Sequence, residues 1–316
     1  MRVARPSIFV DRCGMTLDQL RVFVAVAERR HVTRAAAALG LTQSAASAAI
    51  AALEKRYGAR LFDRVGRGIE LTDTGERFLP EARAVLKQVA SALNVLEEIA
   101  DPAHGSVAIA ASQTIANYWL PRRLAAFQEA FPGVRLDVVI GNTRQVEDAV
   151  AEGRADLGLV EGPIRHTELI RRLVDRDRLV LVVAAGHPLP SAKEAGRVDL
   201  RSVSWVIREA GSGTRAVLEE LALRDGIKVD DLAISLVLPS NEAVREAVEA
   251  GAGATIISEH VVAASLGSGR LQSVPIDLPR RDFSLLRHPD RYASSAARTL
   301  TERLTDRSRD VLLSHN

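Results

Sequence analysis

The 316-residue chain is predicted to combine an all-α N-terminal module and a long helix with a C-terminal α/β domain of two lobes. Between residues 16 and 99, apolar residues recur at intervals of three and four, which is the pattern of amphipathic helices. After residue 105, short apolar runs alternate with helical stretches, which is typical of parallel sheets built from βα units. An apolar fraction of 47% is sufficient for a core in each part.

Three short helices are expected in residues 16–57. Thr16, Thr33 and Thr42 are the expected N-caps, because a hydroxyl oxygen can accept a hydrogen bond from a free N–H of the first turn. Gly40 is expected to end the second helix, since glycine adopts a positive φ without steric cost. Two short helices joined by a turn that contains glycine are the signature of a helix-turn-helix.

A basic hairpin follows in LFDRVGRGIELT, where Gly66 and Gly68 permit a tight turn. Helices followed by such a hairpin make a winged helix-turn-helix, in which the N-terminal residues of the third helix reach base edges in the major groove. Gln and Ser can bind bases there, and arginines on the second helix and the hairpin can bind phosphates. The predicted DNA-contacting residues are Arg34, Thr42, Gln43, Ser44, Ser47, Arg64 and Arg67.

The distribution of charge agrees with phosphate binding at the N-terminal end. The whole chain carries +2, but residues 16–71 contain nine Lys or Arg and five Asp or Glu, and residues 72–316 carry −4. A basic segment on an acidic body is expected when one end binds nucleic acid. The alternative interpretation is a solvated basic face on an ordinary helical domain.

A long helix is expected over residues 74–100, capped by Thr72 or Asp73. Pro80 should kink this helix or mark a later start. An apolar stripe along one face favours pairing with a second helix, as a dimer seam, over packing on the same domain. Two-fold pairing would present two recognition helices to a palindromic site. The stripe consists of Leu79, Ala82, Val85, Leu86, Val89, Leu93, Leu96 and Ile99.

Strands and helices alternate after a hinge-like break at residues 101–105. The apolar run at 179–185 is expected to cross into a second lobe, and the chain to return through Leu271–Pro275. Two lobes with two crossings resemble the periplasmic-binding-protein fold. The expected strands are 106–111, 134–140, 155–160, 179–184, 205–207, 233–238 and 254–257, and the expected helices are 120–130, 146–152, 215–223 and 242–250.

Polar clusters follow several of the expected strands. Ligands of α/β sheets bind beyond the carboxyl ends of strands, where helix N-termini offer free N–H groups to anions. Five such clusters on two facing lobes predict a cleft for a small ligand, although each cluster alone is also typical of an ordinary helix cap. The predicted ligand-binding residues are Ser112, Thr114, Asn142, Thr143, Glu161, Gly211, Ser212, Gly213, Thr214, Ser240 and Asn241.

Other classes of protein find little support in the sequence. The seven histidines form no metal-ligand spacing, no G-x-S-x-G motif occurs, and the GSGT segment lacks the lysine of a phosphate-binding loop. The single cysteine, Cys13, excludes disulfide frameworks and cysteine-based zinc sites. No segment has the length of a membrane span, and the N-terminus lacks a signal-peptide core. A cytoplasmic protein without catalytic activity, cofactor or metal is therefore expected.

The segments LDQLRVFVAVAE, TRAAAALGLTQSAASAAIAALEK, LFDR and LTDTG resemble the DNA-binding domain of LysR-type transcriptional regulators, and the resemblance extends from Met15 to near Thr305. It implies binding to double-stranded promoter DNA, a homodimer through the linker helix and a homotetramer, with RNA polymerase as a further candidate partner. The implied organisation is a disordered extension at 1–14, a winged helix-turn-helix at 15–73, a linker helix at 74–100, an effector domain at 101–305 with lobe I near 105–178 and 273–305 and lobe II near 179–272, and a tail at 306–316.

Three further segments, ASQTIANYWLP, REAGSGTR and LPSNEAVREAVEAGAGATIIS, resemble the branch of this family that regulates sulfite reduction and, less closely, carbon fixation. The branch implies a small anionic effector, with sulfite or a related sulfur oxyanion as the first candidate. Closure of the lobes on this ligand would shift the linker helices and the DNA-binding heads. The alternatives are a small organic acid or metabolite as effector and, from another class, a solute-binding protein or enzyme fused to a DNA-binding module.

Overall fold

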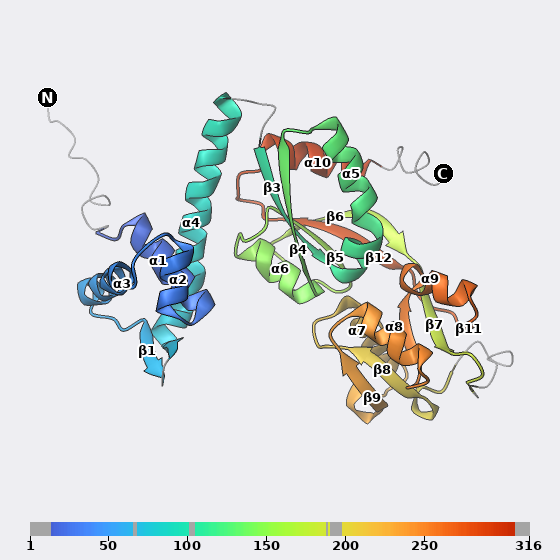
Figure 1. Ribbon diagram of the computed structural model, residues 1–316. Coiled ribbons are helices and arrows are strands. Elements are labelled where there is room, and N and C mark those ends of the chain that lie inside the picture. The colour runs from blue at the N-terminus through green and yellow to red at the C-terminus, as the bar shows by residue number, and fades with distance from the viewer. Residues whose placement is uncertain (1–13, 66–67, 101–104, 188, 190–197, 307–316) are drawn as a thin grey trace, which may run out of the picture. The chain divides into compact units, whose positions relative to one another are not determined.

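The computed structural model describes residues 14–65, 68–100, 105–187, 189 and 198–306 (Figure 1). The chain divides into two compact units, Met1–Leu93 and Asn94–Asn316. The first contains the winged helix-turn-helix and the second an α/β domain of two lobes, so the predicted fold class is confirmed. Residues 1–13 of the predicted extension and 307–316 of the predicted tail lie outside the described residues.

The first unit is built around one aromatic cluster. Phe23 is fully buried, and its ring contacts the rings of Phe62 and Phe78 at centroid distances of 5.4 and 5.0 Å. Phe62 belongs to the hairpin, so this contact ties the wing to the helices. The elements are α1 (Leu17–Arg29), α2 (Val32–Ala38), α3 (Gln43–Tyr57), and the antiparallel strands β1 (Phe62–Val65) and β2 (Gly68–Leu71).

Two of the three predicted helix caps are confirmed. Thr16 and Thr42 each accept a hydrogen bond of 3.2 Å from an N–H in the first turn of α1 and α3. The prediction for Thr33 is wrong, because α2 begins at Val32 and Nδ1 of His31 caps it. α1 ends at Arg29, and Arg30 follows in a left-handed conformation with φ of 47°. His31 is then the extended residue directly before α2, which is the position of an N-cap.

α4 (Asp73–Ala100) follows the wing, and the hydroxyl of Thr72 caps it by accepting from the N–H of Gly75 at 3.1 Å. The helix passes through Pro80 without a break, so its start is not delayed. Its first turns pack on the core of the first unit through Ala82 and its neighbours. Further along, the apolar stripe is exposed at Val85, Leu93 and Leu96.

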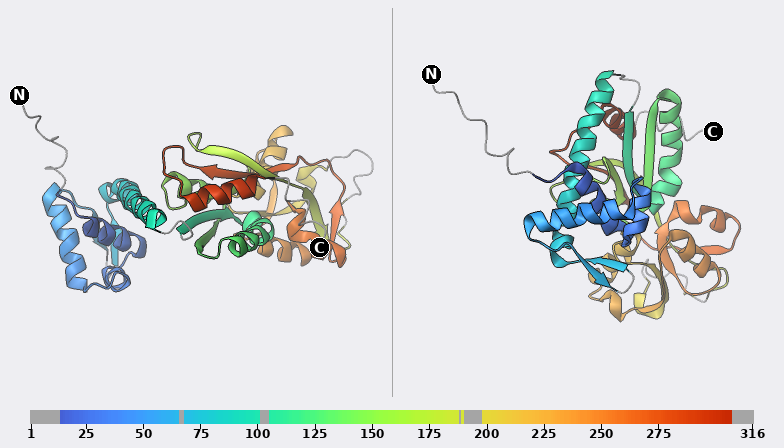
Figure 2. Two further views of the ribbon diagram at one scale, coloured as in Figure 1. Left: turned by 90° about the horizontal axis from the view of Figure 1, so that it is seen from above. Right: turned by 60° about the vertical axis from the view of Figure 1, so that its left-hand side comes forward.

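Lobe I of the second unit is a five-stranded sheet in the order β4-β3-β5-β12-β6. Its core is formed around Trp119, Phe127 and Phe283 on one face, and around Val146 and Val150 on the other. The strands are β3 (Gly105–Ser112), β4 (Val134–Gly141), β5 (Leu157–Glu161), β6 (Ile170–Asp177) and β12 (Arg281–Arg287). The first face is covered by η1 (Ile115–Trp119), α5 (Leu120–Ala130) and α10 (Ser295–Thr305), and the second by α6 (Thr143–Ala151) (Figure 2).

Lobe II contains the strand pair β8-β9 and the strands β10-β7-β11, joined by a bridge between Trp205 and Ala254. Trp205 is fully buried in the core on the α7 side, and α8 and α9 cover the other face. The strands are β7 (Leu179–Ala184), β8 (Ser204–Arg208), β9 (Ala233–Leu238), β10 (Thr255–Ser258) and β11 (Leu271–Val274). The helices are η3 (Leu200–Ser202), α7 (Gly213–Arg224), η4 (Val229–Asp231), α8 (Asn241–Glu249) and α9 (Glu259–Gly267).

Both sheets are mixed, which corrects the prediction of parallel sheets. β12 pairs antiparallel with β5 and β6, and β7 pairs antiparallel with β10 and β11. The chain crosses from β6 to β7 at Arg178 and returns through residues 275–280 to β12. The return was predicted too early, at Leu271–Pro275, because Leu271–Val274 forms β11 and pairs with β7 in lobe II. A strand that enters a lobe from the other lobe starts at the cleft, so it runs opposite to neighbours that end there. β6 and β12 were not predicted, because their charged residues hide the apolar pattern of a strand.

No single helix among the described residues is both long and apolar enough to cross a membrane. α2 and α3 reach the required length and hydropathy only as a pair, and they are bent by 107° relative to each other. No group of three or more His, Cys, Asp or Glu side chains that could hold a metal ion lies within the described part of the chain.

Candidate DNA-binding surface and effector cleft

The outer face of α3 carries the side chains predicted to read bases. Gln43, Ser44 and Ser47 are exposed, whereas Ile50 and Leu53 on the inner face are buried. The exposed residues lie in the first turns of the helix, which is the part of a recognition helix that reaches base edges. The geometry of α3 is therefore compatible with the predicted role.

Thr42 stands just before α3 and is already engaged. Its hydroxyl accepts from the N–H of Ala45 at 3.2 Å and lies 3.0 Å from the hydroxyl of Ser44. These contacts fix the first turn, where free N–H groups favour a phosphate. Thr42 therefore caps α3 and is also exposed on the predicted DNA-binding surface.

Two of the three predicted phosphate-binding arginines lie within the described residues. Arg34 is exposed on α2 and Arg64 on β1, and neither forms an ion pair with another described residue. Their guanidinium groups are available to phosphate oxygens. Arg67, which follows β1 in the sequence, lies outside the described residues.

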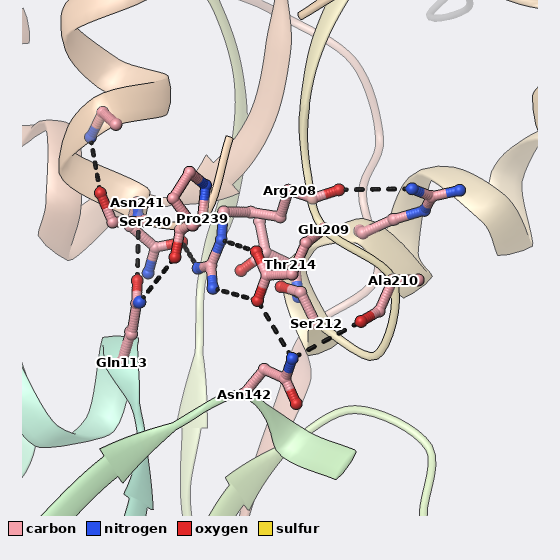
Figure 3. A network of polar contacts seen from close by, with 12 residues as sticks. Gln113, Asn142, Arg208, Glu209, Ala210, Ser212, Thr214, Pro239, Ser240 and Asn241 are labelled. Atoms are coloured by element: carbon pink, nitrogen blue, oxygen red, sulfur yellow. Dashed lines mark hydrogen bonds and ion pairs between the residues drawn. The ribbon is translucent and has the colours of Figure 1, made fainter. Parts of the chain in front are cut away.

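The predicted polar clusters of the two lobes meet in a network of polar contacts (Figure 3), and a small cleft lined by Thr143, Gly211 and Ser212 opens between the lobes. Gln113 of lobe I donates from Nε2 to the carbonyl of Pro239 at 2.9 Å and accepts from the N–H of Asn241 at 3.0 Å. Asn241 in turn donates from Nδ2 to the hydroxyl of Thr114 at 3.0 Å. These bonds join the end of β3 in lobe I to the start of α8 in lobe II.

A second set of contacts joins α6 to the segment before α7. Asn142 donates from Nδ2 to the carboxylate of Glu209 at 3.1 Å, and the N–H of Arg144 donates to the carbonyl of Gly211 at 3.3 Å. Four strand-end segments, two from each lobe, are therefore in direct contact. The polar residues predicted from separate stretches of sequence come together as expected.

Three of the predicted ligand-binding residues also cap helices. Asn142 caps α6, Ser212 caps α7 and Ser240 caps α8, each by accepting from an N–H of the first turn. Thr143, in the first turn of α6, donates from its hydroxyl to the carbonyl of Glu161 at 2.6 Å. The capping interpretation is therefore correct for these residues, and the helices that they cap begin where the lobes meet; their binding of a ligand stays a prediction.

Arg208, at the end of β8, is the central cation of the cleft (Figure 3). It is 3% exposed, and it donates from Nη1 to Oδ1 of Asn241 at 2.5 Å and from Nε to Glu209 at 2.8 Å. Burial of a charge requires such partners. Hydrogen bonding to Arg208 and Asn142 lowers the pKa of Glu209 against the effect of desolvation, the largest single contribution, so the carboxylate stays ionised.

A second buried arginine, Arg281, begins β12. It donates to Asp177 at 2.5 Å and to the hydroxyl of Thr214 at 3.3 Å, and its nearest nitrogen lies 4.0 Å from the carboxylate of Glu161. Asp177 ends β6 and is completely buried. Arg281 therefore connects the crossing strands of lobe I with the first turn of α7 in lobe II.

Glu161 ends β5 and is buried at the cleft. The hydroxyl of Ser112 donates to its carboxylate. Burial raises the pKa of Glu161 to about 7, and the charge of Arg281 opposes the rise. A carboxyl group with this pKa can either donate or accept a hydrogen bond near neutral pH.

Two family models match the chain. Residues 17–76 match the bacterial regulatory helix-turn-helix protein of the lysR family, and residues 100–309 match the LysR substrate binding domain. The chain belongs to the LysR family of transcriptional regulators. It is accordingly a ligand-responsive transcriptional regulator, as its sequence motifs indicated.

Curated members of the LysR family match this chain over most of its length. An uncharacterized HTH-type regulator, YeiE of Escherichia coli (strain K12), is 35% identical over 289 residues, which are 90% of this chain and 95% of YeiE. A probable RuBisCO transcriptional regulator of Cyanophora paradoxa is 30% identical and covers 93% of each chain. The regulator CysL of Bacillus subtilis is 34% identical over 78% of this chain and 82% of its own. Both branches that the motifs suggested are represented.

Solved structures of LysR-type regulators share the fold. Full-length CbnR in complex with its target DNA aligns with a TM-score of 0.65 at 21% identity, covering 92% of this chain and 99% of CbnR. OxyR of Corynebacterium glutamicum aligns with a TM-score of 0.57 at 23% identity, covering 96% of this chain and 95% of OxyR. At these low sequence identities, the structural alignments show the shared fold alone.

Sequence reasoning placed the main polar clusters of this LysR-type regulator but missed several of their polar and charged partners. Gln113 was passed over although it lies between two predicted residues, and Glu209 follows directly after Arg208. Asp177 and Arg281 pair across 104 positions of the sequence, at the ends of two strands that were not predicted. A local pattern could have revealed the first two residues but not the last pair.

Proposed function

We propose that this LysR-type regulator senses a small oxyanion, with sulfite or a related sulfur oxyanion as the first candidate, in the cleft between its two lobes. The observation that carries the proposal is the buried guanidinium of Arg208, which lies beside the first residue of α8. Guanidinium groups and helix N-termini are the features with which proteins most often bind oxyanions. Both meet here, between the starts of α6, α7 and α8.

An oxyanion that binds Arg208 would replace its present hydrogen-bond partners, Asn241 and Glu209. Asn241 is neutral, and the side chain of Glu209 is 31% exposed, so Glu209 can turn to solvent when an anion takes its place. The hydroxyls around the cleft can donate to the remaining oxygens of the ligand. The proposed ligand-binding residues are Ser112, Thr114, Asn142, Thr143, Glu161, Gly211, Ser212, Gly213, Thr214, Ser240 and Asn241, with Arg208 added.

Glu161 favours a ligand that itself exchanges a proton near neutral pH. Because its pKa is raised to about 7, its carboxyl can donate to the charged form of the ligand or accept from the protonated form. Sulfite and hydrogen sulfite coexist near neutral pH, whereas sulfate is fully ionised. The cleft therefore suits sulfite better than sulfate.

A small organic acid is the second candidate effector. The CcmR regulatory domain of Synechocystis in complex with 2-PG aligns with a TM-score of 0.56, and the effector domain of QuiR in complex with shikimate with a TM-score of 0.55. Both ligands bear acidic groups. A carboxylate could bind Arg208 as an oxyanion does.

The DNA-binding part of the proposal rests on the exposed face of α3 and on the basic side chains beside it. CbnR, which shares the fold, was solved with its target DNA, and this supports promoter DNA as the partner. RNA polymerase remains a candidate partner. The residues proposed to contact DNA are Arg34, Thr42, Gln43, Ser44, Ser47, Arg64 and Arg67.

The exposed apolar surfaces support self-association. Leu93 and Leu96 on α4 are 49% and 63% exposed, as expected for half of a helix-pair seam. In the effector domain the edge strands β4 and β9 expose Val139 and Val237 at 68% and 52%. Unpaired edges with apolar side chains favour contact with a second copy. Two such surfaces per chain are what a homotetramer requires.

A thermal-shift experiment tests the effector. Sulfite, sulfate, phosphate, nitrate and small carboxylates are added to the full-length protein, and sulfite at about 100 times its dissociation constant should stabilise it by about 2.7 kcal/mol. The shift should disappear in Thr114→Ala and persist in Ser268→Ala, which removes an exposed hydroxyl outside the cleft. If no oxyanion raises Tm while organic acids do, the second candidate replaces the first.

A further inference from the structure

A second cavity, of about 600 Å³, lies at the hinge of the effector domain. Its walls come from one side of α7 and from both segments that cross between the lobes, with Leu179 on the outgoing crossing and Pro279 and Arg280 on the return. A cavity of this size is within the range of small-molecule sites. Gly213 is the one predicted effector residue in its lining, and the hinge cavity adjoins the small pocket beside Thr143 and Ser212, with which it shares Pro163, Gly213, Ala216 and Glu219.

Two glycines form the wall between this hinge cavity and the cleft. A Cβ atom at Gly213 would lie 1.9 Å from the carbonyl oxygen of Glu161, and one at Gly162 would lie 2.9 Å from Cα of Gly213. No side chain fits at either position, so the start of α7 lies directly against the end of β5. Arg281 belongs to the same wall, because it lines the hinge cavity and donates to Thr214.

Most of the surface exposed inside the hinge cavity is apolar, although six of its fourteen lining residues are charged. Its apolar lining residues include Ala216 and Val217 of α7, Leu179, and the prolines of the adjoining segments. Leu223, at the end of α7, also lines the cavity, and at 74% it is the most exposed large apolar side chain among the described residues. An exposed leucine beside an apolar cavity is the arrangement that a ligand with an apolar body would cover.

One cation of the hinge cavity has no counter-ion. Arg280 is exposed, and it forms no ion pair or side-chain hydrogen bond with any described residue. The other charged side chains of the lining are all paired: Glu219 with Arg215, Glu220 with Arg224, Asp282 with Arg171 and Arg176, and Arg281 with Asp177. The one unpaired charge among the described residues of the lining is therefore the positive charge of Arg280, on the segment that returns to lobe I.

We infer that the hinge cavity is a second ligand site, which binds an organic monocarboxylate with an apolar body. The carboxylate pairs with Arg280, and the apolar body covers Val217 and Leu223. Because both crossings line the cavity, its shape changes whenever the lobes move relative to each other. A ligand there and a ligand in the cleft must then alter each other's affinity by the same factor. This coupling rests on the proposed function, whereas the site itself does not.

Calorimetric titration of the full-length protein with octanoate tests the site. We expect saturable binding, which Arg280→Glu weakens about tenfold, because reversing one exposed charge replaces an attraction by a repulsion. Ala216→Trp, which fills the cavity, should abolish binding. Arg122→Glu makes the same change of charge at an exposed arginine of α5 outside the lining, and it should leave binding unchanged. Octanol, which lacks the charge, should bind about threefold more weakly than octanoate.

The outcomes separate this proposal from the oxyanion proposal. Absence of octanoate binding to the folded wild-type protein overturns the second site. Binding that survives both Arg280→Glu and Ala216→Trp, or that is lost in Thr114→Ala, places octanoate elsewhere and also overturns it. If octanoate binding depends on Arg280 while no oxyanion binds, the hinge site stands and the oxyanion proposal fails. A titration of sulfite with and without octanoate then measures the coupling.

Discussion

The proposed DNA-binding face of α3 and the proposed effector cleft are opposite kinds of site. Gln43, Ser44 and Ser47 are exposed and come from neighbouring turns of one helix. Thr114 and Asn241 are buried, bonded to each other, and 127 positions apart. Side chains on the first surface can be changed without disturbing the fold, whereas those in the cleft also hold the two lobes together. Substitutions should therefore separate binding from stability in the first site and combine them in the second.

The largest expected effect concerns Asp177, the buried partner of Arg281. Asp177→Asn keeps the shape of the side chain but leaves a buried guanidinium without its counter-ion, which should cost about 4 kcal/mol. Urea unfolding of the full-length protein, followed at the transition in which the effector domain unfolds, measures this cost. Asp282→Asn is the matched control, because the side chain of Asp282 is 41% exposed and its ion pairs lie at the surface. This substitution should change the unfolding free energy by about 0.5 kcal/mol or less. Equal costs for the two variants would contradict a stabilising charge network beneath the cleft.

The next effect is a pH dependence at Glu161. The ordinary pKa of a glutamate is 4.5, and burial raises the pKa of Glu161 to about 7, so the folded state binds the proton more tightly. The stabilisation is fully present below pH 4.5 and is lost as pH rises through about 7, and it amounts to about 3 kcal/mol. The neutral variant Glu161→Gln should lack this loss. Unfolding free energies of the two proteins, compared from pH 4.5 to 8, measure it, and parallel curves would mean that Glu161 titrates alike in both states.

Ser47→Glu should affect DNA binding alone. A carboxylate at this exposed position would face phosphates and base edges, and we expect affinity for promoter DNA to fall roughly a hundredfold. The unfolding free energy should remain within about 0.5 kcal/mol of wild type, because the side chain makes no buried contact. Ser268→Glu, an equal change of charge on the effector domain, is the control in a fluorescence-anisotropy titration. A parallel loss of stability in Ser47→Glu would show that α3 is less independent than its exposure indicates.

The same contrast explains what the sequence could predict. Ser47 faces outward because Ile50 and Leu53 face inward, and the helical period fixes that relation within a few residues. Arg281 reaches Asp177 through the antiparallel register of β12 with β6, which depends on the packing of the whole lobe. The cap of α2 gives a smaller example, since His31 replaced Thr33 because of how α1 ends. Local patterns therefore predicted the exposed face of α3 and the polar clusters, but not the charges that join them.

Thr42 has the smallest expected effect and tests the contrast most sharply, because it combines a structural contact with a surface position. Thr42→Ala removes the cap of α3 and should cost about 1 kcal/mol of unfolding free energy. Thr42→Asp keeps a capping oxygen, so stability should stay near wild type, but its charge should weaken DNA binding about tenfold. If DNA affinity follows stability in both variants, Thr42 acts only as a cap. If Thr42→Asp is stable and binds DNA poorly, the residue that orders the first turn of α3 also faces the phosphate backbone, and the two kinds of site meet in one side chain.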